Sequence, residues 1–272
     1  MVPSPFPILH SPKLLMKKTE SLSNPLSLNT TGGADNKTAP EEIARDYQLR
    51  VDVDQILICQ GADPESLRRR RPNIIRLTEE VLEREWHLIK PVLLSRYYTV
   101  SSFSEGTLFL EGGGRLTGPV ITQNLAVAEA VVVLIGTVGR EIDRRISESF
   151  SRKPSYGLAV DGLGTAAADA LLEEAKRVFH MQAAARGWRL SRYLSPGMVG
   201  WEIQEGQKQV FSLIKGDKIG VDLMFSGQMT PQKSISGVLG MGSRVGRPTG
   251  PPCEFCSVRE TCIFQKRHQD TS

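Results

Sequence analysis

Segments with helical periodicity and segments with strand-like alternation follow one another in this chain without a repeating βαβ rhythm. A doubly wound parallel sheet needs that rhythm, because a crossover helix joins each pair of parallel strands. The chain is therefore predicted to have an α+β fold, with strands and helices mixed in a single domain. Its 40% apolar content suits a globular core, and 272 residues are enough for one large domain.

The spacing of apolar residues predicts where the elements lie. The expected helices are residues 73–94, 122–150, 165–186 and 203–214, and a short helix is expected to begin at residues 40–43. The expected strands are within residues 97–110 and at residues 156–160, 221–225 and 234–241. Residues 51–58 fit either a strand or a helix. Residues 125–138 form the longest apolar run, and we interpret them as part of a buried helix because Glu129 and Gly136 interrupt a membrane-length stretch.

The two ends of the chain differ in composition from its middle. Residues 1–40 are rich in Pro, Ser, Asn, Thr and Gly and are predicted to be a disordered extension. Residues 41–245 are expected to form the folded domain. A Pro- and Gly-rich linker and a cysteine-rich tail are expected over residues 246–272.

Three of the four cysteines lie close together in that tail, as Cys253, Cys256 and Cys262. Thiolates at such short spacing suit a soft metal, either an iron–sulfur cluster or zinc, although free or redox-active thiols remain an alternative. Cys59 is far away in sequence. It is either a fourth ligand or, as is commoner for a lone cysteine, a buried apolar thiol.

Composition excludes some classes of function. The net charge is only +4, and the one dense basic run, Arg68 to Arg71, has no aromatic residues interleaved with it, so no nucleic-acid surface is expected. No apolar run reaches the ~18 residues of a membrane span, and the N-terminus lacks the apolar core of a secretory signal. We therefore expect a cytoplasmic protein that contacts neither nucleic acid nor membrane.

The stretch Arg192-Tyr-Leu-Ser-Pro-Gly197 has the chemistry of a small carboxylate site. An arginine offers a planar fork of donors, and a Pro-Gly turn lets the backbone approach a ligand closely. Upstream, Gly162-x-Gly164 resembles a dinucleotide fingerprint, but no acidic residue follows at the required distance, and close packing of the helix start against a preceding strand explains it better. Glu173, judged from the sequence alone, is a solvated ion-pair partner of Arg177.

Three segments, residues 161–175, 192–197 and 229–240, together resemble the AdoMet-binding reactivation (activation) domain of vitamin B12-dependent methionine synthase, where AdoMet is S-adenosylmethionine. The resemblance implies an antiparallel sheet with packed helices. It also implies that Glu173, seven residues before His180, lies in the AdoMet groove. Arg192 or its immediate surroundings would take the position of the family's arginine.

The same resemblance assigns the rest of the turn. Ser195, Gly197 and Met198 would line the AdoMet pocket, with Met198 where the family has a tyrosine. Lys233 and the hydroxyls of Ser234 and Ser236 would be further polar contacts. No residue is assigned a catalytic role, because the reacting groups belong to the cofactors.

The function implied is reductive methylation of a cobalamin cofactor, in which AdoMet is the methyl donor. The chain would be a methionine synthase-type activation component in methionine biosynthesis. Its partners would be a corrinoid-binding protein or methionine synthase subunit, and an electron donor such as flavodoxin or ferredoxin. The chain has no Asp-x-His-x-x-Gly motif for cobalamin, so the corrinoid would be carried by the partner. The alternative is a metal-stabilised binding or assembly protein that keeps this fold without catalysis.

Overall fold

The computed structural model of the chain describes residues 40–246. The predicted extension before residue 40 and the cysteine-rich tail, with Cys253, Cys256 and Cys262, lie outside the described residues. The part of the chain that is described mixes helices with an antiparallel sheet, so the predicted α+β fold is confirmed. None of its helices is both long and apolar enough to cross a bilayer.

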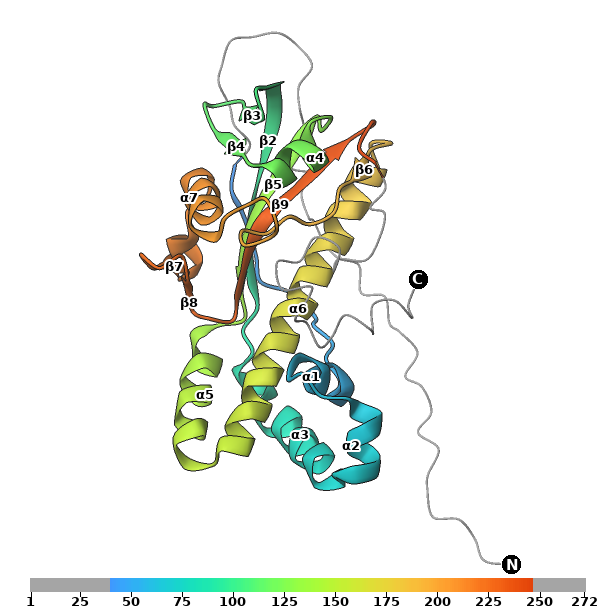
Figure 1. Ribbon diagram of the computed structural model, residues 1–272, viewed down its shortest axis with the longest axis vertical. Coiled ribbons are helices and arrows are strands. Elements are labelled where there is room, and N and C mark those ends of the chain that lie inside the picture. The colour runs from blue at the N-terminus through green and yellow to red at the C-terminus, as the bar shows by residue number, and fades with distance from the viewer. Residues whose placement is uncertain (1–39, 247–272) are drawn as a thin grey trace, which may run out of the picture. The chain divides into compact units, whose positions relative to one another are not determined.

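The sheet of the described domain has seven strands, all paired antiparallel (Figure 1). Its centre is made of β2 (Val92–Ser104), β5 (Ala130–Thr137) and β9 (Ser234–Gly242). The strand order is β4-β3-β2-β5-β9-β6, and β1 pairs with β2 beside this path. The shorter strands are β1 (Glu42–Ala44), β3 (Thr107–Leu110), β4 (Arg115–Thr117) and β6 (Arg189–Leu190), and a separate hairpin consists of β7 (Asp222–Leu223) and β8 (Met229–Thr230).

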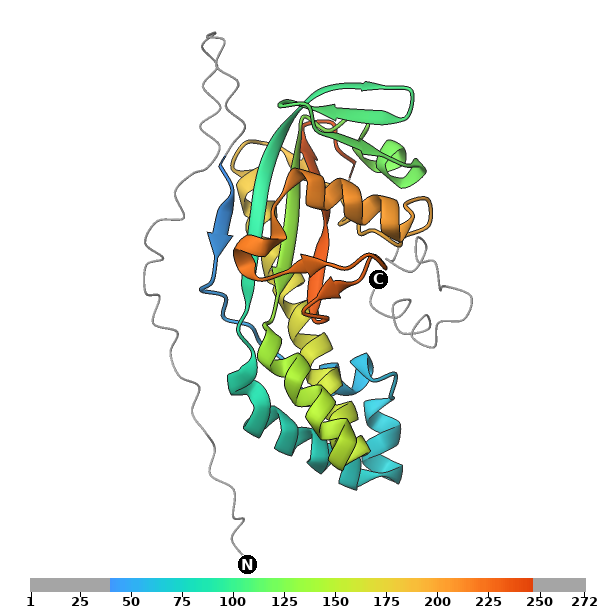
Figure 2. The ribbon, with the colours of Figure 1, turned by 90° about the vertical axis from the view of Figure 1, so that its left-hand side faces the viewer.

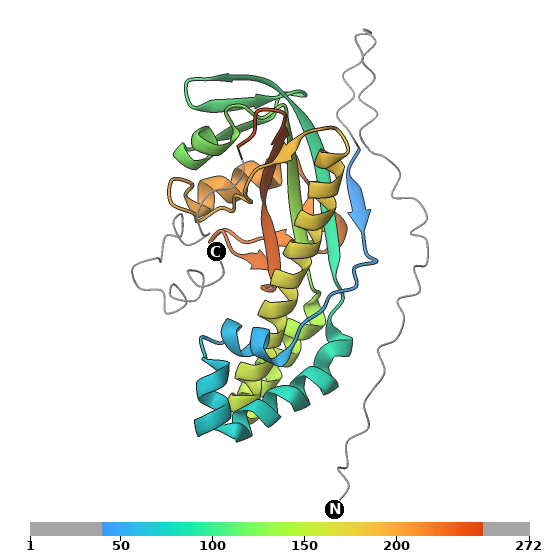
Figure 3. The same cartoon turned by 90° about the vertical axis from the view of Figure 1, so that its right-hand side faces the viewer.

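Helices cover the two faces of the sheet unequally. The helix α6 (Pro154–Ala184) is 31 residues long and crosses one face, whereas α7 (Ile203–Leu213) and the β7–β8 hairpin lie on the other (Figures 2 and 3). The first half of α6 extends beyond the sheet and packs against a group of helices. That group is α1 (Val53–Cys59), α3 (Pro72–Glu85) and α5 (Arg140–Arg152), with α2 (Pro64–Arg70) beside α3, while α4 (Pro119–Leu125) caps the far end of the sheet.

Two predicted elements of the middle of the chain are wrong. Residues 122–150 are not one helix, since the apolar run within them is the central strand β5 between α4 and α5. A short apolar run that is buried on all sides has no period that separates strand from helix. Residues 156–160 are not a strand, because α6 begins at Pro154, whose fixed φ suits the first turn of a helix.

The glycines of the fingerprint-like segment are therefore inside α6 rather than at its start. A Cβ on Gly162 would lie 2.6 Å from Cγ of Gln60 and 2.9 Å from the carbonyl oxygen of Ile56. The predicted reason for this glycine, close packing, is right, but the neighbour is α1 and not a preceding strand.

Other boundaries shift by smaller amounts. The helix expected over residues 73–94 ends at Glu85, and a 3₁₀ turn (Trp86–Leu88) leads into β2. Residues 40–43 lead into the strand β1 and not into a helix. The ambiguous residues 51–58 form α1, where Asp52 and Gln55 make a reciprocal capping box. The strands within residues 97–110 and at 234–241 and the helix at 203–214 are confirmed, and residues 221–225 contain the two-residue strand β7.

A buried ion pair fastens the helical half of the domain. Glu85 of α3 is 5% exposed and accepts hydrogen bonds from Arg145 of α5, at 2.7 and 3.0 Å, and from the hydroxyl of Tyr156 of α6, at 2.7 Å. Burial alone would raise the pKa of Glu85, but the hydrogen bonds from Arg145 and Tyr156 outweigh it and hold the pKa below its ordinary value. One carboxylate thus ties three helices together.

We predict that Glu85→Gln lowers the free energy of unfolding by about 2 kcal/mol at neutral pH, because bonds from a cation to a carboxylate become bonds to a neutral amide. Since the folded pKa is depressed, this stabilisation is present above the ordinary glutamate pKa and is lost as the pH falls through the folded value. Urea unfolding at neutral and acid pH measures both effects. The exposed Glu83→Gln on the same helix is the control, and an equal loss in both variants would contradict the role of Glu85.

Candidate functional site

The loop from β6 to α7, residues 191–202, contains four of the five predicted AdoMet-binding residues and is held along the edge of β9. Leu194 and Val238 exchange both backbone hydrogen bonds, at 3.0 and 2.9 Å. Ser191 fixes the entry of the loop, since its amide donates to the Gly240 carbonyl and its hydroxyl accepts from the Gly240 amide, both at 2.8 Å. The loop is therefore an extension of the sheet and not a free connection.

Gly237 on β9 is the residue that lets the loop lie so close to the strand. A Cβ at Gly237 would lie 2.3 Å from the carbonyl oxygen of Leu194 and 2.5 Å from Cε2 of Tyr193. Any larger residue would push the loop away from the strand. The glycine that follows Ser236 is therefore what lets the loop lie against β9.

The predicted pocket residues Ser195, Gly197 and Met198 come together in one tight turn. The Met198 amide donates to the Ser195 carbonyl at 3.2 Å, and the Gly197 amide donates to the Trp201 carbonyl at 2.8 Å. Gly197 has φ +97°, which residues with a side chain adopt only with strain. The Met198 side chain is half-buried against the core, and its sulfur lies 3.5 Å from the Ser195 amide nitrogen.

The helix α7 supports the turn from the other side. A Cβ on Gly206 would lie 2.8 Å from Cβ of Pro196, so the first turn of α7 presses directly on the Pro-Gly corner. Ser236 of β9 donates through its hydroxyl to Gln207 of α7 at 2.9 Å, in a buried contact. The turn is therefore fixed between a strand and a helix before any ligand arrives, which reduces the entropy lost on binding.

Arg192, predicted with its immediate surroundings to take the position of the family's arginine, and its neighbour Tyr193 differ in their contacts. Tyr193 lies four residues before Gly197, and its hydroxyl donates to the Ser236 carbonyl. Arg192, one residue earlier, is half-buried, and its carbonyl accepts from the Ser191 hydroxyl at 2.7 Å. Sequence reasoning did not single out Tyr193. The available signal was its position four residues before Gly197.

The fifth predicted residue, Glu173, lies on α6, and its side chain is 67% exposed. Its ion-pair partner is Lys176, at 2.7 and 2.9 Å, whereas Arg177 pairs with Glu174. The expected pairing of Glu173 with Arg177 is therefore wrong. Within residues 40–246, no hydrogen bond or ion pair joins Glu173 to the loop, but α6 and the loop both adjoin β9.

Polar residues recur every four positions on this side of α6, so Asp161, Thr165, Asp169 and Glu173 lie along one face. Lys233, which directly precedes β9, donates to Asp161 and to the Thr165 hydroxyl, both at 2.8 Å. Its stem lies against Gly164. The predicted polar contact Lys233 is thus already engaged in joining α6 to β9, as Ser236 is in joining α7 to β9.

Asp169 on the same face contacts Cys59 of α1, whose sulfur lies 3.7 Å from Oδ2. Asp169 is exposed as a residue, but its carboxylate is crowded by its neighbours, and this partial loss of water raises its pKa, to which the charge of Glu173 adds. Burial and then the Asp169 charge raise the pKa of the Cys59 thiol to about 12. The thiol is therefore a hydrogen-bond donor at neutral pH and not a thiolate.

Within residues 40–246, no group of three or more His, Cys, Asp or Glu side chains has the geometry of a metal site. The predicted ligands Cys253, Cys256 and Cys262 fall outside the described residues, so their metal stays a prediction. Cys59 is half-buried, and its thiol contacts the Asp169 carboxylate, so its surroundings are not those of a buried apolar thiol. Its alternative role as a fourth metal ligand stays a prediction.

Comparison with known proteins supports the fold. No protein-family model matches the chain, and no curated protein matches it in sequence. A solved structure of the MetH reactivation domain bound to AdoHcy superposes with a TM-score of 0.55 at 11% identity, over 74% of this chain and 78% of that one. At that identity the likeness shows a shared fold, so the predicted fold resemblance is confirmed and the residue roles stay predictions.

We predict that Cys59 reacts slowly with iodoacetamide at neutral pH, because almost none of it is thiolate. In a chain with Cys253, Cys256 and Cys262 changed to Ser, Cys59 is the one remaining cysteine. Its rate of alkylation is then measured as a function of pH by mass spectrometry. Adding Asp169→Asn removes the neighbouring negative charge and replaces the carboxylate acceptor with a neutral amide, and should speed the reaction several-fold. Glu174→Gln, on another side of α6, is the control. A rate equal to that of the urea-unfolded chain would contradict the raised thiol pKa.

Proposed function

We propose that this chain binds AdoMet at the loop of residues 191–202 and presents it to a corrinoid carried by a partner protein, as an activation component of a methionine synthase-type methyltransferase. The observation that carries the proposal is the turn from Ser195 to Met198, fixed between β9 and α7. Its support is the fold, which is shared with a reactivation domain that holds AdoHcy.

Arg192 is proposed to hold the carboxylate of AdoMet. A guanidinium can donate two parallel hydrogen bonds to a carboxylate, and such charge-assisted pairs are about twice as strong as neutral ones. Tyr193 packs on Gly237, whose missing Cβ faces the α6 side, so strand alternation favours the opposite side for Arg192. Because β6 ends at Leu190 at the sheet edge, a long side chain at position 192 has room to turn around that edge.

The polar face of α6 supplies the opposite charge. AdoMet carries an ammonium and a sulfonium, and both are attracted by carboxylates. Glu173 is proposed to take the ammonium or the ribose hydroxyls, exchanging its exposed pair with Lys176 for the ligand. Asp169, one turn away, adds a second negative charge. A cation bound here would relieve the repulsion between the two carboxylates.

The turn would form the floor of the pocket. Gly197 exposes its backbone to the ligand, and the Met198 thioether offers a soft apolar surface for the nucleoside but cannot donate the hydrogen bond that a tyrosine would. The methyl transfer itself requires a reduced corrinoid on the partner and an electron donor such as flavodoxin or ferredoxin. This chain's contribution is positioning, which makes the encounter effectively unimolecular.

The proposal is tested first by calorimetric titration of AdoMet into the full chain. We expect one saturable site, and Arg192→Gln should weaken binding by about ten- to a hundred-fold, because a charge-assisted pair contributes about 1.5–3 kcal/mol. Glu173→Gln should weaken it by a smaller factor, since its carboxylate is exposed. The exposed Arg189→Gln, three residues earlier, is the control. Unchanged affinity in Arg192→Gln would rule out Arg192 as the group that holds the carboxylate. No binding by the unaltered chain would contradict the proposal that this chain binds AdoMet.

The tail provides a separate prediction. If Cys253, Cys256 and Cys262 hold iron–sulfur or zinc, elemental analysis and visible absorbance of the purified chain should detect it, and replacing the three by Ser should remove it. The same variant should keep AdoMet binding and lose reductive methylation of a corrinoid protein. Retained methylation without metal would show that the tail does not take part in the electron transfer, whereas no methylation by the unaltered chain would favour the alternative of a metal-stabilised assembly protein without catalysis.

A further inference from the structure

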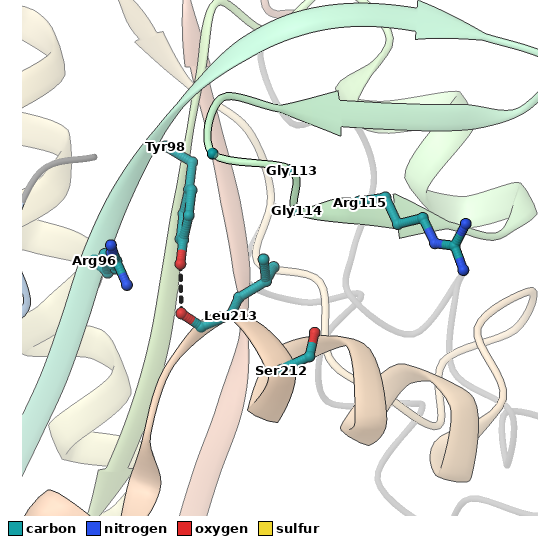
Figure 4. Close-up of a pocket in the computed structure, with 8 residues that line it drawn as sticks. Arg96, Tyr98, Gly113, Gly114, Arg115, Ser212 and Leu213 are labelled. Atoms are coloured by element: carbon teal, nitrogen blue, oxygen red, sulfur yellow. Dashed lines mark hydrogen bonds between the residues drawn. The ribbon is translucent and has the colours of Figure 1, made fainter. Parts of the chain in front are cut away.

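A concave site lies on the α7 side of the sheet, at the end of α7 opposite the loop of residues 191–202. It is a cavity of about 490 Å³ between β2, the β3–β4 turn and the last turn of α7 (Figure 4). That volume is within the range of small-molecule pockets. Its lining includes Arg96, Arg115, Ser212 and the three glycines of residues 112–114.

The glycine turn shapes this cavity. Gly112 and Gly113 have φ of +84° and +87°, and a Cβ on Gly113 would meet no atom within 4 Å, so the backbone there borders open space. Gly114, by contrast, presses on α7, since its Cβ would lie 2.4 Å from Leu213. The turn therefore closes one side of the cavity and leaves bare backbone facing a ligand.

The two arginines lie on opposite sides of this turn, as Figure 4 shows. Arg96 stacks over the Tyr98 ring at 5.1 Å and lies 3.8 Å from Glu41, a carboxylate that it shares with Lys218. Arg96 and Lys218 carry two positive charges against the single negative charge of Glu41, so the Arg96 end of the cavity is positive. Arg115 is exposed and forms no ion pair with any residue in the described range. Because a guanidinium has five donors, Arg96 can hold Glu41 and a ligand together.

The C-terminal end of α7 opposes an anion, because helix carbonyls carry partial negative charge there. The structure weakens that effect, since the Tyr98 hydroxyl donates to the Leu213 carbonyl and the Ser212 hydroxyl donates to the Gln209 carbonyl. Arg96 and Arg115 are the charged residues among those that line the cavity.

We propose that this cavity binds a small molecule with two anionic groups, carboxylate or phosphate, one held by Arg96 and the other by Arg115. The cavity is much larger than a single inorganic anion needs, and its charges are separated, so a two-ended ligand fits better than one ion. This site is independent of AdoMet binding.

The test is calorimetry on the full chain with pyrophosphate, succinate and, as a single-charge reference, acetate. We expect pyrophosphate or succinate to bind at one site and acetate to bind at least about tenfold more weakly. The dianion that binds better distinguishes a phosphate from a carboxylate ligand. Failure of both dianions to bind, or acetate binding as tightly as they do, would overturn the proposal.

Variants locate the site. Arg115→Gln should weaken the dianion by about tenfold or more, and Ser212→Glu, which adds a repelling charge to an exposed position in the lining, should abolish binding. Arg76→Gln, an exposed arginine on α3, removes the same charge elsewhere and should leave the affinity unchanged. Equal losses in Arg76→Gln and Arg115→Gln would show non-specific attraction and overturn the site. Circular dichroism confirms that each variant is folded.

Discussion

The strand β5 pairs on both sides along its whole length, and the arrangement of the rest of the domain depends on this pairing. All eight of its residues are buried. It runs in unbroken register against β2 on one side and β9 on the other. Because one face of β5 packs towards α7 and the other towards α6, a slip of one residue would exchange the two faces. The register of β5 therefore determines where β9 lies, and β9 carries the contacts that join the loop and α6 to the sheet.

Contacts from β9 fix two neighbouring parts of the domain, the loop of residues 191–202 and the helix α6. Towards the loop, Gly237 lets the chain lie against the strand, and the Ser236 carbonyl accepts from both Tyr193 and Ser195. Towards α6, Lys233 joins the strand to Asp161 and Thr165. The lysine is 14% exposed, so its ion pair is better shielded from water than the surface pairs of α6. The two halves of the proposed AdoMet site are thus fixed to one strand rather than to each other.

The sequence was sufficient for the fold class and for the residues of the turn, because both depend on local signals. A Pro-Gly pair after an arginine predicts a turn wherever the chain places it. It was insufficient for β5, which is buried on all sides and lacks a distinguishing period. It was also insufficient for the start of α6, because five residues at 156–160, of which Leu158 is exposed, are too few to separate a helix from a strand. Glu129, taken as an interruption, instead binds Ser243 at the edge of the sheet, at 2.6 and 2.7 Å. Such a contact spans 114 residues and has no signature in sequence.

The place of Arg192, five residues before Gly197, has a structural consequence that the motif alone hides. In an extended segment neighbouring side chains face opposite sides, so Arg192 and Tyr193 lie on opposite sides of the chain. Leu194 packs into the α7-side core, while Tyr193 lies against Gly237 and the Ser236 carbonyl. The place nearest to α6 is therefore taken by a half-buried tyrosine, and the positive charge arrives from the sheet edge. A carboxylate held by Arg192 would lie further from Glu173 than one held at position 193, which favours an extended ligand over a compact one.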